Sequence, residues 1–199
     1  MFVQVISGQA GDGAGLRRQF ERWASDLRPS STGFLGSTAG VTTDGRFVAV
    51  ARFEDEQSAR ANSDRPEQSA WWDETERFFD GPVTFRESSD VEMLARGGSD
   101  EAGFVQVIEG RTTDRPQFMD LERRLEPGFV AERPDFIGSL LVWWHDGTWV
   151  EVAYFTSEDE ARAGEERGLS PQVSDVFAKW QQVAAASSFL DLTEPWMVS

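Results

Sequence analysis

FVQVISG at residues 2–8 returns as FVQVIEG at residues 104–110, with six of the seven residues identical. Residues 34–61 match residues 136–163 at the same offset of 102 residues, with 13 identities among 28 positions. Solenoid repeats have periods of about 20 to 50 residues, so a period this long indicates duplication of a whole domain. The 199-residue chain is therefore expected to consist of two similar halves.

The halves are predicted to span residues 1–95 and 104–199, and the polar, Gly-rich stretch 96–103 (RGGSDEAG) is predicted to join them as a linker. A lone core of about 100 residues is marginally stable. Packing the two halves on each other would bury more apolar surface.

The apolar pattern in each half predicts a strand, a helix, a hairpin of two strands, a second helical region and a last strand. An Asp-Gly pair lies between the hairpin strands, as Asp44-Gly45 and as Asp146-Gly147. The predicted elements span residues 2–6, 16–27, 33–42, 46–53, 55–61, 66–79 and 83–87, then 104–108, 117–125, 136–144, 148–155, 158–186 (with a break near 168–171) and 188–192.

This βαββαβ order is that of the ferredoxin-like unit, with helices on one face of an antiparallel sheet. The fold class is thus α+β, with two tandem ferredoxin-like units. Because each sheet keeps one bare face, the two bare faces are predicted to pack together as an intramolecular pseudo-dimeric α/β barrel. We expect a monomer that acts as a pseudo-dimer, or a weak homodimer.

Composition excludes several function classes. A net charge of −16 disfavours nucleic acid as a partner. The absence of cysteine rules out disulfides and thiolate metal sites, and His145 as the single histidine, beside the Asp-Gly turn, leaves no usual metal cluster, so neither metal nor cofactor is expected. No long apolar run suggests a membrane segment, and the chain is expected to be cytoplasmic.

Three sequence features carry a family resemblance: the run GFLG at 33–36, the strand VAVARF at 48–53 and the acidic helix start EDEQSA at 54–59. The second half has FIG at 136–138 and VEVAYFTSEDEA at 150–161. With the order of elements, these motifs resemble the dimeric alpha-beta barrel superfamily, and in particular its antibiotic biosynthesis monooxygenase-like branch. The resemblance covers nearly the whole chain, twice.

Members of that superfamily usually build the barrel from two chains, so the resemblance implies a barrel built from one. Their activities include cofactor-free oxygenation, haem degradation, haem-dependent peroxidation and plain ligand binding, so fold leaves function open. Haem-degrading members resemble this chain in a strand-one amide (Gln4 or Gln106) and a helical tryptophan (Trp71 or Trp72). Their helical histidine is missing here, where the chain reads ANS at 61–63 and AGE at 163–165.

Gln4 and Gln106 hold the same place in an apolar strand, where a buried amide must find hydrogen-bond partners. Both side chains would point into a cavity if their strand face lined the barrel interior; a structural amide is the alternative. Glu151, flanked by valines, replaces Ala49 of the first half. A carboxyl in apolar surroundings tends to have a raised pKa, which makes Glu151 the candidate catalytic residue, as proton acceptor or donor. A hydrogen bond to a ligand and a structural ion pair with an arginine are also open.

Aromatic side chains gather in the second hairpin, where they line either a ligand pocket or a core. The candidate ligand-binding residues are Gln4, Gln106, Trp71, Trp72, Trp143, Trp144, Trp149 and Tyr154. Any functional cavity is expected mainly in the second half, around Glu151.

The leading interpretation is a small-molecule-binding protein with an aromatic-rich, metal-free barrel pocket for a small apolar or aromatic molecule. One alternative is a cofactor-independent monooxygenase that acts on an aromatic or polyketide-like substrate. Another is a structural or regulatory interaction module without a ligand.

Overall fold

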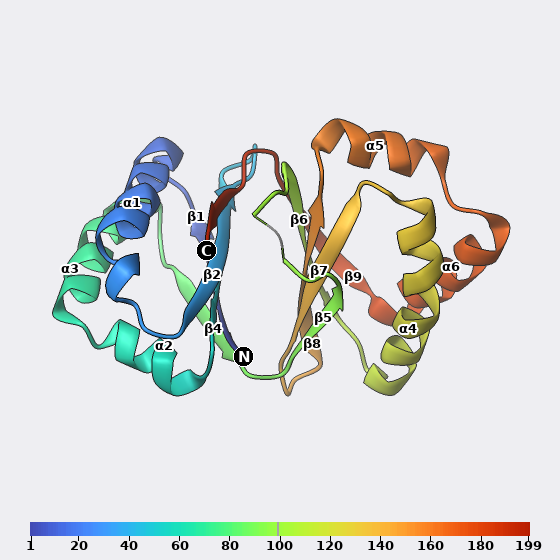
Figure 1. Cartoon of the computed structure of the whole chain (residues 1–199), viewed down its shortest axis with the longest axis horizontal. Helices are drawn as coiled ribbons and strands as arrows, with labels where there is room; N and C mark the ends of the chain where they lie inside the picture. Colours follow the sequence, from blue (N-terminus) through green and yellow to red (C-terminus); the bar gives the residue numbers. More distant parts are fainter. Residues whose placement is uncertain (99) are drawn as a thin grey trace. The chain divides into compact units, whose positions relative to one another are not determined.

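The computed structural model describes residues 1–98 and 100–199, and Ser99 of the predicted linker lies outside the described residues. The described chain forms two compact units (Figure 1). The first unit comprises Met1–Val91 and Glu194–Ser199, and the second comprises Glu92–Thr193. Each unit contains one five-stranded sheet with helices on one of its faces (Figure 1).

In the first unit the sheet order is β10-β2-β3-β1-β4. The elements are β1 (Phe2–Gln9), α1 (Gly13–Asp26), the 3-10 turn η1 (Arg28–Ser30), β2 (Phe34–Val41), β3 (Arg46–Phe53), α2 (Glu56–Ser63), α3 (Pro66–Thr75), the 3-10 turn η2 (Glu76–Phe78), β4 (Thr84–Ser88) and β10 (Trp196–Val198). All four strand pairs of this sheet are antiparallel.

The second unit repeats this arrangement with the sheet order β5-β7-β8-β6-β9. Its elements are β5 (Val91–Ala95), β6 (Phe104–Arg111), α4 (Arg115–Glu132), β7 (Phe136–Trp143), β8 (Thr148–Phe155), α5 (Glu158–Arg167), α6 (Pro171–Ala184) and β9 (Ala186–Leu192). The predicted α+β class, the antiparallel sheets and the duplicated βαββαβ order are confirmed. The packing of one sheet on the other stays a prediction.

The compact units differ from the predicted halves in two short strands. β5 follows the first repeat along the chain but adds to β7 of the second sheet, and β10 follows the second repeat but pairs with β2 of the first. One of the two edge strands of each sheet, β10 in the first and β5 in the second, therefore comes from the other repeat. The sequence boundaries at residues 95 and 104 follow the duplication, whereas the compact units follow the strand pairing.

Glycines in the hairpins have two distinct roles. Gly45 and Gly147 have φ angles of +85° and +80°, the left-handed conformation that the turns after β2 and β7 need. Gly36 and Gly138 follow matching irregularities in β2 and β7. A Cβ atom on Gly138 would lie 2.7 Å from the backbone nitrogen of Gly97, so glycine allows the chain beside β5 to approach closely.

Strand alternation in the second unit decides which side chains meet the helices. On β6, Phe104 and Ile108 pack with helical residues, since Phe104 joins a cluster with Ala161 of α5 and Ile108 a cluster with Phe118 of α4. Gln106 lies between them on the same face. This face of the sheet, together with α4, α5 and α6, encloses the candidate site.

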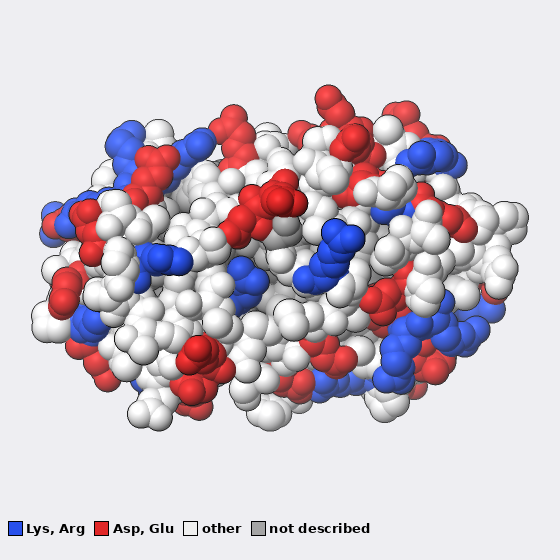
Figure 2. Space-filling model, viewed as in Figure 1, with Lys and Arg blue, Asp and Glu red and all other residues white. Residues whose placement is uncertain are grey.

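No helix within residues 1–98 and 100–199 is both long and apolar enough to span a membrane. On the face of the protein seen in Figure 2, the arginine and lysine side chains are scattered among acidic ones.

Candidate functional site

A cavity of about 830 Å³ lies in the second unit between the sheet and the three helices. Gln106 and Ile108 of β6 and Glu151 and Ala153 of β8 form part of its floor, and residues of α4, α5 and α6 form its other walls. The volume falls within the range of small-molecule pockets in proteins.

Aromatic rings form much of the wall. Phe177 and Trp180 of α6 stack with ring centroids 5.8 Å apart and planes inclined by 11°, and Phe129 of α4 continues the stack with a centroid 6.3 Å from Phe177. Phe136 and Phe155 line the cavity from the sheet. Such a wall suits a flat, apolar molecule.

Two buried carboxyl groups face this cavity, Glu122 from α4 and Glu151 from β8, with exposed fractions of 7% and 8%. Burial, and after it the charge of Glu151, raise the pKa of Glu122 to about 9. Burial also raises the pKa of Glu151, an effect that the neighbouring Ser139 hydroxyl opposes. At neutral pH the pair therefore holds at least one proton.

Several polar atoms at the site have no hydrogen-bond partner of ordinary geometry within the described residues. They are one carboxyl oxygen of Glu122 (Oε2), the hydroxyl of Ser139 and the indole nitrogen of Trp180, each buried. The Trp180 indole lies near enough to Glu122 to oppose the rise in its pKa, yet no well-formed bond joins them. An unpartnered buried donor or acceptor costs about 1 to 3 kcal/mol, which a bound molecule could recover.

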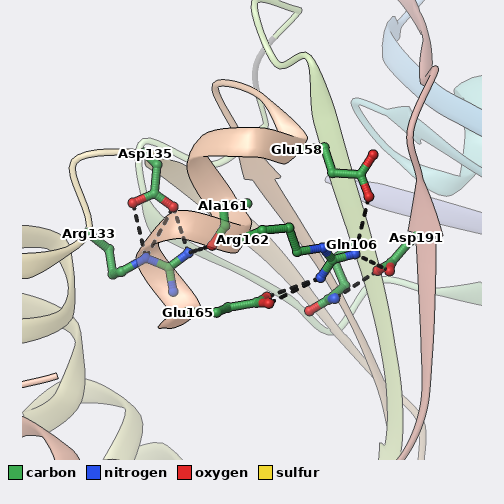
Figure 3. A network of polar contacts seen from close by, with 8 residues as sticks. All are labelled: Gln106, Arg133, Asp135, Glu158, Ala161, Arg162, Glu165 and Asp191. Carbon is green, nitrogen blue, oxygen red and sulfur yellow. Dashed lines mark hydrogen bonds and ion pairs between the residues drawn. The ribbon is translucent and has the colours of Figure 1, made fainter. Parts of the chain in front are cut away.

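Arg133, at the end of α4, lines the cavity as half of a buried ion pair. Its Nε donates to both oxygens of Asp135 at 3.0 and 3.1 Å, and its Nη2 donates to Asp135 at 2.6 Å and to the carbonyl of Ala161 at 3.1 Å (Figure 3). Only 7% of the Arg133 side chain and 4% of the Asp135 side chain are exposed. The guanidinium charge is therefore already neutralised.

Arg162 of α5 forms the second network in Figure 3. It bonds Asp191 of β9, pairs with Glu165 at 3.2 Å and reaches Glu158 at 3.5 Å. Gln106 donates to the other oxygen of Asp191 at 2.8 Å. Through Asp191, the side-chain amide of Gln106 therefore links β6 to β9 and α5, which is a structural role.

The first unit lacks the carboxyl pair. Asp12 and Asp114 are the N-caps of α1 and α4. The residue eight positions after the cap is Phe20 in the first unit and Glu122 in the second, so Phe20 is the equivalent of Glu122. Ala49, the partner of Ile6, takes the place of Glu151. The Phe20 ring contacts Phe47, Trp71 and Trp196 at centroid distances of 5.4, 5.6 and 5.7 Å, so apolar packing stands where the second unit has acids.

Among the residues predicted from the sequence, Glu151 and Gln106 come together at the cavity. The cavity lies on the helix-covered face of the sheet and not on the face expected to line a barrel interior. The reason is that Gln106 lies on the same face of β6 as Phe104 and Ile108, and the helices cover that face. Gln4 lies in the first unit and donates to Glu87 of β4 at 2.8 Å, a structural bond between neighbouring strands.

The predicted aromatic residues of the second hairpin lie outside the cavity wall. Trp143 and Trp149 are buried in the core of the unit, where the Trp149 indole donates to the carbonyl of Ala184 at 3.0 Å. Tyr154, also buried, points to the face opposite Glu151 because strand neighbours alternate. Trp144 is half-buried where the strand ends.

Trp71 and Trp72 of α3 belong to the first unit. Trp71 is buried and its indole donates to the carbonyl of Gln19 at 2.9 Å. Trp72 is half-buried and packs edge-to-face against Phe85, with ring centroids 4.9 Å apart. Both tryptophans join the core of that unit.

Sequence reasoning missed Glu122, Trp180 and the stacked phenylalanines of α4 and α6. Glu122 lies in the buried stripe that also contains Phe118, Leu121 and Leu125 of α4. Aligning the two N-cap aspartates would have exposed the replacement of a phenylalanine by a carboxylic acid. No comparable sequence signal marks Trp180, because the second helical regions differ in length.

Within residues 1–98 and 100–199, no group of three or more His, Asp or Glu side chains has the arrangement of a metal site. His145 is exposed in the turn between β7 and β8. The unpaired chemical groups that the described cavity wall offers include the two buried carboxyl groups and the aromatic rings.

The two units define a ferredoxin-like protein with the fold of the antibiotic biosynthesis monooxygenase-like proteins. Over its full length the chain is similar to a candidate monooxygenase from Fusobacterium nucleatum, with a TM-score of 0.75, 9% identity and 92% of that chain covered. A candidate monooxygenase from Lactobacillus acidophilus gives a TM-score of 0.68 and 9% identity, with 100% of this chain and 99% of the other covered. An anthrone oxidase-like protein gives a TM-score of 0.63 and 11% identity, with 100% and 91% covered.

No protein-family model matches the chain, and no curated protein has significant similarity to it in sequence. At identities of 9 to 11%, the structural likeness shows the fold alone. Function must therefore be argued from the cavity.

Proposed function

We propose that the protein binds a small hydrophobic, aromatic molecule in the cavity of its second unit. The observation that carries this proposal is the pair of buried carboxyl groups, Glu122 and Glu151, facing an aromatic-walled cavity of about 830 Å³. Burying two acids lowers stability, and replacing buried charged groups by apolar ones is often stabilising. The first unit shows that this fold accepts phenylalanine and alanine at the same positions, so the acids are not needed for folding.

The cavity also argues against a purely structural module. An interaction module gains stability from a filled interior, because cavities cost free energy in proportion to their volume. The second unit instead keeps an open volume with unpartnered polar atoms of Glu122 and Trp180 in its wall. A ligand that fills the volume and pairs with these atoms accounts for both features.

The test is calorimetric titration with a neutral flat probe, 2-naphthalenemethanol. Wild-type protein is expected to bind it with one site, and Ala153→Leu, which adds bulk to the cavity floor, is expected to weaken binding at least tenfold, or about 1.4 kcal/mol. Ala51→Leu at the equivalent position of the first unit is the matched control. Equal affinities for wild type and Ala153→Leu would contradict binding in this cavity.

A second candidate function is cofactor-independent oxygenation, which the placement of Glu151 favours. Its carboxylate would remove a proton from a bound substrate, and the resulting anion would reduce dioxygen directly, with one oxygen atom entering the product and the other leaving as water. The raised pKa values weigh against this role as the leading one, since the pair keeps at least one proton at neutral pH. Ligand binding is therefore proposed as the leading function, ahead of oxygenation.

Oxygen uptake with anthrone separates the two functions. A binding protein leaves the rate of anthrone autoxidation unchanged. An oxygenase accelerates it, and Glu151→Gln, which keeps the shape of the side chain, removes the acceleration. Ala49→Ser on the equivalent strand of the first unit is the control and should leave the rate unchanged.

A further inference from the structure

We propose that the molecule bound in the second unit is an organic cation, a protonated amine with a flat apolar body, whose charged end lies at Glu122 and Glu151. This inference rests on the proposed function and specifies the class of ligand. It follows from the charges of the cavity wall, from the partners those charges already have, and from the rings around them.

The wall carries more acid than base. Its guanidinium groups belong to Arg133 and Arg162, and its carboxyl groups belong to Glu122, Glu126, Glu151, Glu165 and Asp191. Both guanidinium groups are already paired, Arg133 with Asp135, and Arg162 with Asp191, Glu158 and Glu165. Among the described lining residues, no basic group remains to receive an anionic ligand.

Glu122 and Glu151 are in the opposite situation. Neither carboxyl forms an ion pair with a described residue, although both are more than nine-tenths buried. Buried acids without a cationic partner stay partly protonated, which removes most of their cost. A ligand ammonium group placed between them would supply the missing partner and would donate a hydrogen bond to the unpartnered oxygen (Oε2) of Glu122.

The other charged groups facing this pair do not supply that partner. Glu126 of α4 and Glu92 of β5 add negative potential at Glu122, and both contribute to its raised pKa after burial and Glu151. The lining residues from α6 are not ionisable, and those from α5 and β9 belong to the Arg162 network. Within the described wall, therefore, no cationic side chain balances the negative potential at Glu122 and Glu151.

The aromatic stack provides the complementary surface for the rest of the ligand. Phe129, Phe177 and Trp180 present ring faces and edges along one wall, ending near Glu122. Aromatic faces attract cations, most strongly in desolvated sites, and also accommodate flat hydrocarbon rings. A neutral ring would use the stack alone, whereas an aromatic amine would use the stack and the acids.

The experiment is a calorimetric titration of the full chain at pH 7 with three probes of one shape. They are 2-naphthylmethylamine (a cation), 2-naphthalenemethanol (neutral) and 2-naphthoate (an anion). The amine is expected to bind at least tenfold more tightly than the alcohol, and the anion more weakly than both. Amine binding should also release protons, because the ammonium group lowers the pKa values of the acid pair; two buffers of different ionisation enthalpy measure that release.

Glu122→Gln and Glu151→Gln keep the shape of the cavity and should each weaken amine binding about tenfold and abolish most of the proton release. Glu67→Gln, an exposed change of the same charge in the first unit, should alter none of these quantities. The buffer comparison on wild-type protein tests the inference even if a variant fails to fold.

Equal binding of amine and alcohol without proton release would overturn the cation assignment and leave the proposed binding function intact. If wild type and the Ala153→Leu variant bound the alcohol with equal affinity, the assignment of the binding site to this cavity would be contradicted. Binding of none of the three probes would contradict both proposals.

Discussion

The carboxyl groups of Glu122 and Glu151 lie close enough inside the second unit that the charge of Glu151 raises the pKa of Glu122, which burial has already raised. One acid comes from the helix after β6 and the other from the centre of β8. The first unit has Phe20 and Ala49 at these positions. The duplicated fold thus carries an acid pair in one copy and apolar packing in the other.

Stability should depend on pH through Glu122. Because the pKa of Glu122 is about 9 in the folded protein and near 4.5 when unfolded, the folded state holds a proton that the unfolded state has lost between these values. The free energy of unfolding should therefore fall as pH rises, by up to about 1.4 kcal/mol per pH unit. Denaturant unfolding at pH 5.5 and 8.5 should show this fall in wild type and a much smaller one in Glu122→Gln.

Glu67→Gln, with an exposed carboxyl removed, is the control and should retain the wild-type pH dependence. An equally steep fall in Glu122→Gln would mean that the buried acid does not hold its proton in the folded state.

The reciprocal change in the first unit should be costly. Phe20→Glu would remove a ring that contacts Phe47, Trp71 and Trp196 and would bury a carboxyl without a partner. The expected loss is about 3 to 5 kcal/mol. Thermal unfolding of Phe20→Glu and Phe20→Leu separates the two causes, since leucine keeps the apolar character; a similar melting temperature for both would indicate that burial of the charge matters little.

Gly164 of α5 is predicted to protect the Arg133–Asp135 pair. A Cβ atom on Gly164 would lie 2.4 Å from Nε and 2.8 Å from Cζ of Arg133. Gly164→Ala should therefore displace the buried guanidinium and destabilise the protein by about 3 kcal/mol. In Gly13→Ala, by contrast, the atoms nearest to the new methyl would be those of Val41 at 3.7 Å, an ordinary contact, and stability should change little. Similar melting temperatures for the two variants would contradict the protective role.

The exchanged strand β10 should stabilise the first unit. Trp196 packs its ring 5.7 Å from Phe20 and 6.2 Å from Phe47. Trp196→Ala is expected to cost about 2 kcal/mol, less than a fully buried tryptophan because the ring is half-buried. Amide hydrogen exchange should accelerate in β2, the strand that pairs with β10, and unchanged protection there would show that β10 is dispensable.

Much of the fold could be predicted because the local signals agree with it. The repeat at residues 2–8 and 104–110 marks the first strand of each unit, and the Asp-Gly pairs mark the hairpins. The exchange of β5 and β10 could not be predicted, because these strands are short and nothing in their sequence distinguishes pairing with one sheet edge from pairing with the other.

The site could be predicted only in part. Glu151 was identifiable because it stands in a strand where the first copy has alanine. Trp149 was expected at the pocket, but its indole bonds the end of α6 and fills the core, a tertiary contact that strand alternation does not reveal. Trp180 and Phe177 lie on a helix whose counterpart is shorter, so the repeat provided no comparison for them.

The most direct test of the account is to make the second unit like the first. The double variant Glu122→Phe with Glu151→Ala restores both first-unit residues, and calorimetric titration with 2-naphthylmethylamine then measures what the acid pair contributes. We expect a folded protein, at least as stable as wild type, with no measurable binding of the amine. Undiminished amine affinity in that variant would contradict the claim that the cavity at Glu122 and Glu151 is the binding site.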